Sequence, residues 1–293
     1  MEQTGLLLKG VGGLYEVLTP DGICECRARG ILRKQGISPL VGDHVTIRTE
    51  EDGSNTIAAI EGRKNSLIRP PLANLDRLVL IVSTCDPYPN LLVIDKLIAI
   101  CEFKGIEPVL VITKSDRKQD EELRRIYTMA GFQVILASGH TGEGVEEVRT
   151  LLGSGVSALA GNSGVGKSTL LNAVCPELSL QTGEISKKLG RGRHTTRHVE
   201  LYRLGEGFVA DTPGFSSLDL TRCETILKEQ LPHCFREFAP YEEDCRFTGC
   251  LHTAKGGCAV IQAVEEGKIH PSRYQNYRAL YEQVKDIKEW ELK

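Results

Sequence analysis

Hydrophobic and polar residues alternate in short runs along the first part of the chain, which predicts short strands. Glycine, proline and aspartate residues separate these runs at nearly regular spacing, as is typical of a small all-β barrel or sandwich. We expect this region, residues 1–66, to be the first domain. The predicted strands are residues 6–8, 14–18, 23–29, 45–48 and 56–60.

From residue 67 to residue 218, short and continuously apolar runs alternate with segments of helical periodicity. Continuous apolar runs are typical of parallel strands buried on both faces, and the alternation predicts a doubly wound α/β domain. In residues 198–204, apolar and polar residues alternate more than in these continuously apolar runs, as in an exposed or edge strand. The predicted strands are 78–82, 109–112, 134–137, 156–160 and 208–210, with helices at 91–103 and 121–129.

Strand-like runs stop after residue 218, so residues 219–293 are predicted to form a helical domain. Its last segment, 271–293, places apolar residues at helical spacing. A helix that packs its tyrosines on its own domain is the favoured interpretation, and a platform for stacking RNA bases is the alternative. The apolar positions are Tyr277, Leu280, Tyr281, Val284 and Ile287.

A glycine-rich segment of the second domain matches the phosphate-binding loop pattern G-x-x-x-x-G-K-[ST]. Residues 161–168, with the sequence GNSGVGKS, lie between the predicted strand 156–160 and a predicted helix at 168–174. In this context backbone N–H groups bind phosphate at a helix N-terminus. Lys167 is expected to reach the β- and γ-phosphates, and the Ser168 hydroxyl to ligate Mg²⁺. The alternative is a chance glycine-rich turn.

The segment Thr113-Lys114-Ser115-Asp116 has the N/T-K-x-D form of a guanine-binding segment and ends a predicted strand. The Asp116 carboxylate can accept hydrogen bonds from guanine N1–H and N2–H₂, and the Lys114 stem can lie along the base. Ser138 closes the next strand. A solvated charged turn is the alternative. In an ordinary GTP-binding domain the phosphate loop comes first, so the reversed order predicts a circularly permuted GTPase.

Two further segments fit the γ-phosphate side of such a site. Asp211-Thr212-Pro213-Gly214 has the D-x-x-G form, in which Asp211 holds Mg²⁺ through water and the Gly214 N–H contacts the γ-phosphate. A turn made by Pro-Gly alone is the alternative. Within the polar stretch 182–198, Thr196 is expected to supply a second Mg²⁺ hydroxyl in preference to Thr195.

Phe215 follows Gly214, where many GTPases carry a glutamine that orients the attacking water. An apolar side chain cannot position water, so another group has to do so. His194 is the candidate, and contact of His194 with RNA or solvent is an equally open alternative.

Cys245, Cys250, His252 and Cys258 form the pattern C-x4-C-x-H-x5-C. Three thiolates and one imidazole match a closed, tetrahedral, structural zinc site. Reduced, buried cysteines without a metal are the alternative, and His233 and Cys234 are alternative ligands.

The formal net charge of −3 excludes a globally basic nucleic-acid binder, so RNA contacts must be local. Residues 183–203 are one such region, with six Lys/Arg against two Asp/Glu. No apolar run approaches the ~20 residues of a membrane-spanning helix, and residues 1–13 lack the pattern of a secretion signal. We expect a monomeric, cytoplasmic protein without membrane contact.

Together the motifs resemble those of the RsgA (YjeQ) family of circularly permuted GTPases. They are T-K-S-D, G-N-S-G-V-G-K-S-T, G-R-H-T-T-R, D-T-P-G-F and the cysteine–histidine cluster. The resemblance implies an OB-like barrel (1–66), a permuted GTPase domain (67–218) and a helical zinc-binding domain (219–293). It also implies late assembly of the small ribosomal subunit, contact with its rRNA and GTP hydrolysis stimulated by that subunit.

The resemblance implies a role for individual residues as well. His194 lies at the position of the family's proposed catalytic histidine. Lys167 and Thr196 are expected to be further catalytic residues. Zinc would be held by the cysteine–histidine cluster, and Mg²⁺ by Ser168 and Thr196. The expected nucleotide contacts are Thr113, Lys114, Ser115, Asp116, Ser138, Gly161, Asn162, Ser163, Gly164, Val165, Gly166, Lys167, Ser168, Thr169, Asp211 and Gly214.

Two other functions stay open. The first is an RNA-directed GTPase that acts on the large subunit or on tRNA. The second is a non-enzymatic nucleic-acid-binding module with a vestigial phosphate loop, against which the intact Lys167, Ser168 and Asp211 argue.

Overall fold

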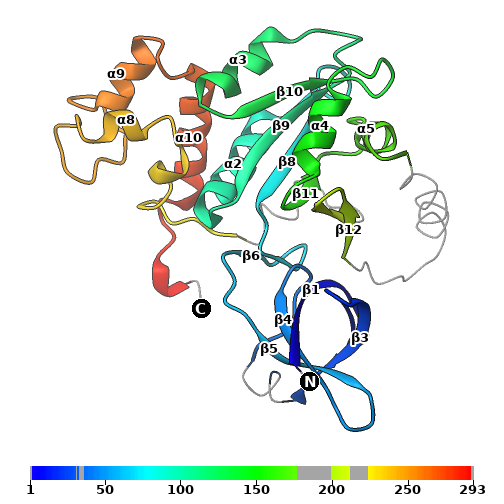
Figure 1. The fold of residues 1–293 in the computed structure, drawn as a ribbon. Coiled ribbons are helices and arrows are strands. Elements are labelled where there is room, and N and C mark those ends of the chain that lie inside the picture. Colours follow the sequence, from blue (N-terminus) through cyan, green and yellow to red (C-terminus); the bar gives the residue numbers. More distant parts are fainter. Residues whose placement is uncertain (1, 31, 33–35, 177–198, 212–223, 292–293) are drawn as a thin grey trace. The chain divides into compact units, whose positions relative to one another are not determined.

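The computed structural model describes residues 2–30, 32, 36–176, 199–211 and 224–291 (Figure 1). The chain divides into two compact units, each assembled from segments that are distant in sequence. The first consists of Met1–Arg77, Arg149–Leu159 and Glu177–Phe215, and the second of Leu78–Val148, Ala160–Pro176 and Ser216–Lys293.

Five strands at the start of the chain close into a barrel. β1 pairs with both β2 and β4, and the circuit is completed by the pairs β2–β3, β3–β5 and β5–β4. All pairs are antiparallel except β3–β5. Closure leaves no open edge, and the inward side chains Leu7, Val17, Val45, Ile47 and Ile57 are fully buried. The predicted OB-like barrel is confirmed. Its strands are β1 (Glu2–Val11), β2 (Leu14–Thr19), β3 (Gly22–Ala28), β4 (His44–Thr49) and β5 (Asn55–Ile60).

Three further strands belong to the same unit. β11 (Val156–Ala160) is parallel to β13 (Gly207–Asp211), and β12 (Glu200–Leu204) is antiparallel to β13. β12 is half-exposed, as its alternating sequence predicts, but it also carries β1 on its other side through the pair Lys9–Glu200. The short strands β6 (Ser66–Leu67) and β7 (Leu72–Ala73) pair with each other and were not predicted.

The second unit contains a parallel sheet in the order β10–β9–β8. Its strands are β8 (Arg77–Ser83), β9 (Glu107–Thr113) and β10 (Gln133–Ala137), joined by helices α2 (Leu91–Lys104) and α3 (Glu121–Met129). The Asn90 side chain caps α2 and Gly105 ends it in the left-handed conformation. The predicted α/β alternation is therefore confirmed, and α4 (Val145–Leu152) and α5 (Lys167–Val174) follow.

The chain from Glu224 onward is helical wherever it is regular, as predicted. Tyr277 is fully buried, and its ring lies 5.2 Å from that of Phe235 and 5.0 Å from that of Phe238. The tyrosines of the last helix thus pack on their own unit. The elements are η1 (Pro232–Cys234), α8 (Ala239–Glu242), α9 (Ala259–Glu265), α10 (Pro271–Val284) and η2 (Glu289–Glu291). Within the described residues, no helix has the length and apolar character needed to cross a membrane.

A buried guanidinium joins α10 to α2. Arg273 is fully buried and donates to Asp95 Oδ1 at 2.6 Å and to Glu237 Oε1 at 2.6 Å. Burial alone would lower the pKa of Arg273, but the two carboxylates raise it, so the side chain stays charged. Asn276 donates to the other oxygen of Asp95 at 2.6 Å, and the ring of Phe235 lies 4.6 Å from the guanidinium. Each of the three guanidinium nitrogens of Arg273 thus donates to a carboxylate oxygen.

We expect Arg273→Leu to destabilise the protein by about 3–5 kcal/mol, because two buried carboxylates lose their counter-ion. Thermal unfolding followed by circular dichroism measures the effect. Arg125→Leu is the matched control, since Arg125 pairs with Glu122 at 3.9 Å on an exposed surface of α3 and such pairs contribute about 0–1 kcal/mol. Equal melting temperatures for the two variants would contradict the prediction.

Candidate nucleotide-binding site and metal centre

The phosphate loop, residues 161–168, joins the buried strand β11 to the N-terminus of α5. At its first position only glycine fits, because a Cβ on Gly161 would lie 2.6 Å from the carbonyl oxygen of Ile81. Lys167 Nζ donates to the Gly161 carbonyl at 3.3 Å, so the lysine side chain folds back over the loop. Ser168 and Thr169 are exposed in the first turn of α5. The predicted strand–loop–helix context is present.

The segment 113–116 begins at the carboxyl end of β9, where ligands of parallel sheets bind. Lys114 has a φ of 61°, a left-handed conformation that costs energy in a residue other than glycine. Two contacts hold this conformation. The Thr84 hydroxyl donates to the Lys114 carbonyl at 3.0 Å, and Lys114 Nζ donates to the Asp86 carbonyl at 2.5 Å.

Thr113 connects this segment to the phosphate loop. Its buried hydroxyl is within hydrogen-bonding distance of the Val82 carbonyl, at 2.9 Å, and of the Val165 carbonyl. Many GTPases have asparagine at this position. The structure shows that threonine also makes a side-chain contact between the two segments.

The loop after β10 presents Ser138 to Asp116. The Ser138 oxygen accepts hydrogen bonds from the backbone N–H groups of His140, at 3.3 Å, and Thr141, at 3.2 Å. Its own proton is donated to the Asp116 carboxylate, and this hydrogen bond lowers the pKa of Asp116. Asp116 is therefore ionised and acts as an acceptor at neutral pH, as guanine binding requires.

Four of the predicted residues cannot be placed in this geometry. His194, Thr196 and Gly214 lie outside the described residues. The backbone of Asp211 ends β13, but its side chain is also outside the description.

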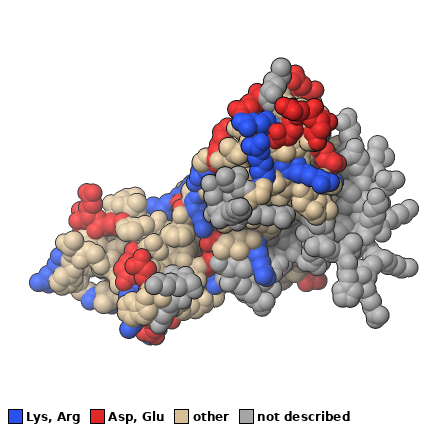
Figure 2. Space-filling model, turned by 90° about the horizontal axis from the view of Figure 1, so that it is seen from below, with Lys and Arg blue, Asp and Glu red and all other residues tan. Residues whose placement is uncertain are grey.

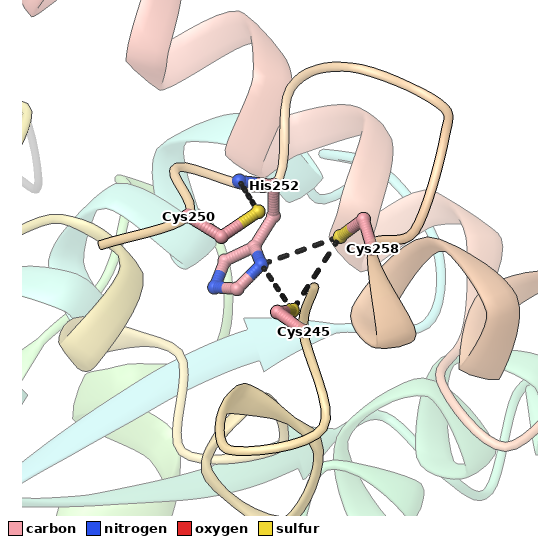
Figure 3. A group of neighbouring side chains, drawn as sticks. All are labelled: Cys245, Cys250, His252 and Cys258. Carbon is pink, nitrogen blue, oxygen red and sulfur yellow. Dashed lines mark hydrogen bonds between the residues drawn. The ribbon is translucent and has the colours of Figure 1, made fainter. Parts of the chain in front are cut away.

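The four predicted metal ligands come together in the helical region (Figure 3). Their ligand atoms all lie within 4.8 Å of one another. The sulfurs of Cys245 and Cys258 are 4.0 Å apart, close to the edge of about 3.8 Å expected for two thiolates on a tetrahedral zinc ion. The cluster therefore has the donor set and spacing of a structural metal site.

His252 turns its Nδ1 atom toward the sulfurs, 3.4 Å from Cys258 Sγ and 3.7 Å from Cys245 Sγ (Figure 3). Burial lowers the pKa of His252, which favours the neutral imidazole that binds metals. Its other nitrogen, Nε2, lies 3.8 Å from Glu242 Oε1, a buried oxygen without a hydrogen-bond partner in the described chain. A carboxylate in this place suits a metal-bound histidine, whose second nitrogen carries a proton.

Burial also raises the pKa of Cys258 to about 12, so a thiolate there needs a cation beside it. The two alternative ligands lie outside the cluster. His233 Nδ1 is 3.3 Å from Glu242 Oε2, and the Cys234 thiol donates to the Gln230 carbonyl at 3.4 Å. The original four-residue interpretation is the one that the geometry supports.

The sequence matches the RsgA GTPase family over residues 60–221 and the RsgA N-terminal domain over residues 4–57. A relative from Geobacillus sp. (strain WCH70), named small ribosomal subunit biogenesis GTPase RsgA, is 45% identical over 97% of this chain and 98% of its own. A relative of the same name from Caldanaerobacter subterraneus subsp. tengcongensis is 44% identical over 96% of each chain. This chain belongs to the RsgA family.

Solved structures of similar proteins agree with RsgA family membership. YjeQ from Thermotoga maritima has a TM-score of 0.81 at 32% identity and covers 98% of this chain and 100% of its own. YloQ, described as a circularly permuted GTPase, has a TM-score of 0.80 at 35% identity, with coverages of 98% and 96%. The predicted permutation and GTP hydrolase activity are confirmed by these findings together with the family matches.

Three contacts of this RsgA family site were not predicted from the sequence. They are the bond from Thr84 to Lys114, the bond from Lys114 to Asp86, and a bond from Ser115 Oγ to Glu143 Oε2 at 2.7 Å. Thr84 and Asp86 follow β8 directly, so their position after an apolar run was a signal for them. Glu143 lies in a polar turn, where the sequence carried no signal.

We expect Thr113→Val to loosen the phosphate loop, because it removes the hydroxyl that contacts Val165 while keeping the side-chain shape. Loss of such a buried hydrogen bond costs about 1–3 kcal/mol. Faster hydrogen exchange of the backbone amides at 161–168 is the expected result. Thr113→Ser, which keeps the hydroxyl, is the control and should exchange like the wild type. Equal exchange in the valine variant would refute the role of this contact.

Proposed function

We propose that this protein hydrolyses GTP in the assembly of the small ribosomal subunit, and that binding of the subunit stimulates hydrolysis. The main support is the joining of segment 113–116 to the phosphate loop through Thr113, in a chain whose relatives carry the name of that function. The acceptor-only Asp116 supports guanine as the base. GTP and GDP are then the nucleotide partners, and rRNA of the small subunit is the macromolecular one.

In this proposal Asp116 accepts from guanine N1–H and N2–H₂, and Lys114 lies along the base. The backbone N–H groups of 161–169 and Lys167 bind the phosphates, a positioning that supplies most of the catalysis in phosphoryl transfer. Ser168 and Thr196 would hold Mg²⁺ directly, and Asp211 through water. The ion, when bound, neutralises charge on the β- and γ-phosphates. The Gly214 N–H contacts the γ-phosphate, and His194 positions the attacking water.

Contact with rRNA is proposed to be local. On the face drawn in Figure 2, acidic side chains gather in one region and basic side chains lie beside them. In the barrel, Arg29 pairs with Glu50 at 2.8 Å and Lys9 with Glu200 at 3.1 Å, which leaves less free positive charge for phosphate. We also propose the three domains 1–66, 67–218 and 219–293, a monomeric state and a cytoplasmic location.

We further propose zinc as the metal of the Cys245, Cys250, His252 and Cys258 cluster. The three sulfurs and one nitrogen, the tetrahedral spacing and the buried Glu242 oxygen behind His252 all suit zinc. Zinc would stabilise the part of the chain around the cluster, where the preceding elements η1 and α8 are only short helical turns.

GTP turnover with and without purified small ribosomal subunits tests the function. We expect the subunit to raise the rate of GTP hydrolysis, and ATP not to be used at a comparable rate. Lys167→Ala should lower the rate of GTP hydrolysis by about 100-fold or more, because a charge that stabilises the transition state is removed.

His194→Ala should lose the stimulation of GTP hydrolysis by the subunit, and His198→Ala is its control. Equal rates with and without small subunits would refute the proposal, and stimulation by large subunits or tRNA would favour the other RNA-directed function.

Metal analysis tests the zinc proposal. We expect about one zinc per chain as purified, lost in Cys258→Ser together with stability of the helical region. Cys234→Ser makes the same chemical change at a buried cysteine outside the cluster and should retain zinc. Zinc loss in Cys234→Ser but not in Cys258→Ser would assign the ligands differently, and a metal-free wild type would refute the site.

A further inference from the structure

A hydrogen bond links the two segments that face the guanine base in the proposed site. Ser115 donates from Oγ to Glu143 Oε2 at 2.7 Å, across 28 residues of sequence. Ser115 is buried, directly between Lys114 and Asp116 in the chain. A contact on Ser115 therefore acts on the backbone that carries both predicted base contacts.

Glu143 is held in place by the loop that also presents Ser138. The backbone N–H of Ser138 donates to the Glu143 carbonyl at 2.9 Å, and the N–H of Gly142 donates to the Ser138 carbonyl at 2.9 Å. The next residue, Gly144, has a φ of 67°, and a Cβ there would lie 2.0 Å from the Leu136 carbonyl oxygen. Only glycine fits at position 144, and the two backbone hydrogen bonds position the backbone from which the Glu143 side chain extends.

We propose that Glu143 is a positioning residue for guanine selectivity in the GTPase reaction. It holds Ser115 by a hydrogen bond from the loop after β10, and with Ser115 the backbone of Asp116. Glu143 thereby restrains Asp116 through the neighbouring residue, Ser115. This inference rests on the proposed role of Asp116 in binding guanine.

Selectivity depends on this restraint because a carboxylate must meet N1–H and N2–H₂ at the same time. Hypoxanthine has the N1–H but lacks the N2 amino group. If Asp116 is displaced, its carboxylate can no longer accept hydrogen bonds from both N1–H and N2–H₂ of guanine. The one hydrogen bond from N1–H of hypoxanthine has a less strict geometry and is retained more readily. The ratio of IDP to GDP dissociation constants therefore measures the position of Asp116, and a general loss of stability would leave that ratio unchanged.

The experiment measures Mg²⁺-dependent binding of GDP and IDP by competition with a fluorescent GDP analogue. We expect Glu143→Ala to lower the ratio of the IDP to the GDP dissociation constant about tenfold. This is the change in affinity expected from the loss of one hydrogen bond to a charged group. Ser115→Ala should do the same, and the double variant should lose no more than either single one. Glu143→Gln keeps an acceptor oxygen and should restore most of the selectivity.

Glu147→Ala is the matched control, since it makes the same change at an exposed position in the first turn of α4. It should bind both nucleotides like the wild type. An IDP/GDP ratio in Glu143→Ala within about twofold of the wild type overturns the inference, as does additive loss in the double variant. A wild type with no preference for GDP over IDP would refute the proposed guanine site itself, and the inference with it.

Discussion

The buried guanidinium of Arg273 is the constraint on which the second unit depends. It brings α10 to α2 across 178 residues of sequence, and α2 is the helix that joins β8 to β9. Thr84 follows β8 directly and donates to the Lys114 carbonyl, and Thr113, the last residue of β9, contacts the Val82 carbonyl, so both strand ends position the candidate base-binding segment 113–116. Burying a charge is unfavourable unless every part of it is paired. The pairing with Asp95 and Glu237 therefore defines one arrangement of α10 on α2, and displaced arrangements lose it.

Reversal of the motif order is compatible with a normal site because the site is made by contacts across strand ends. The phosphate loop follows segment 113–116 in the chain, yet Thr113 contacts the carbonyl of Val165, 52 residues later. Ligands of parallel sheets bind where the carboxyl ends of strands meet, whatever order the strands have in the chain. A circular permutation changes which strands are connected by loops, but it does not change which strand ends meet at this edge of the sheet.

Local sequence patterns predicted the elements and the motifs, but not the contacts that position them. The barrel strands, α2, α3, α10 and the four cysteine–histidine ligands all carry their signal within a few residues. Arg273 carried none, since a single arginine in a polar helix predicts an exposed face, and its partners Asp95 and Glu237 lie on distant elements. Ser115 was a predicted site residue, but its hydrogen bond to Glu143 was not predicted, because the sequence of a polar turn does not indicate which distant residues its side chains contact. The pair β6–β7 is too short for any periodicity to show.

The candidate metal site, Cys245, Cys250, His252 and Cys258, is supported by the last helix, α10, through side chains other than Arg273. Tyr277 donates to the Leu251 carbonyl at 2.5 Å, Tyr274 to that of His252 at 2.9 Å, and Arg278 to that of Thr253 at 2.8 Å. These bonds satisfy three successive carbonyls and support His252 at its left-handed φ of 50°.

Hydrogen bonds from α10 thus hold the loop at residues 251–253. These bonds do not involve the three cysteine sulfurs or the Glu242 carboxylate. A metal on Nδ1 would leave the His252 proton on Nε2, facing the Glu242 oxygen that otherwise has no partner in the described chain. Metal binding would therefore complete a hydrogen bond as well as a coordination shell. The stability that it would add belongs to residues 245–258, while α10 remains fixed by Arg273.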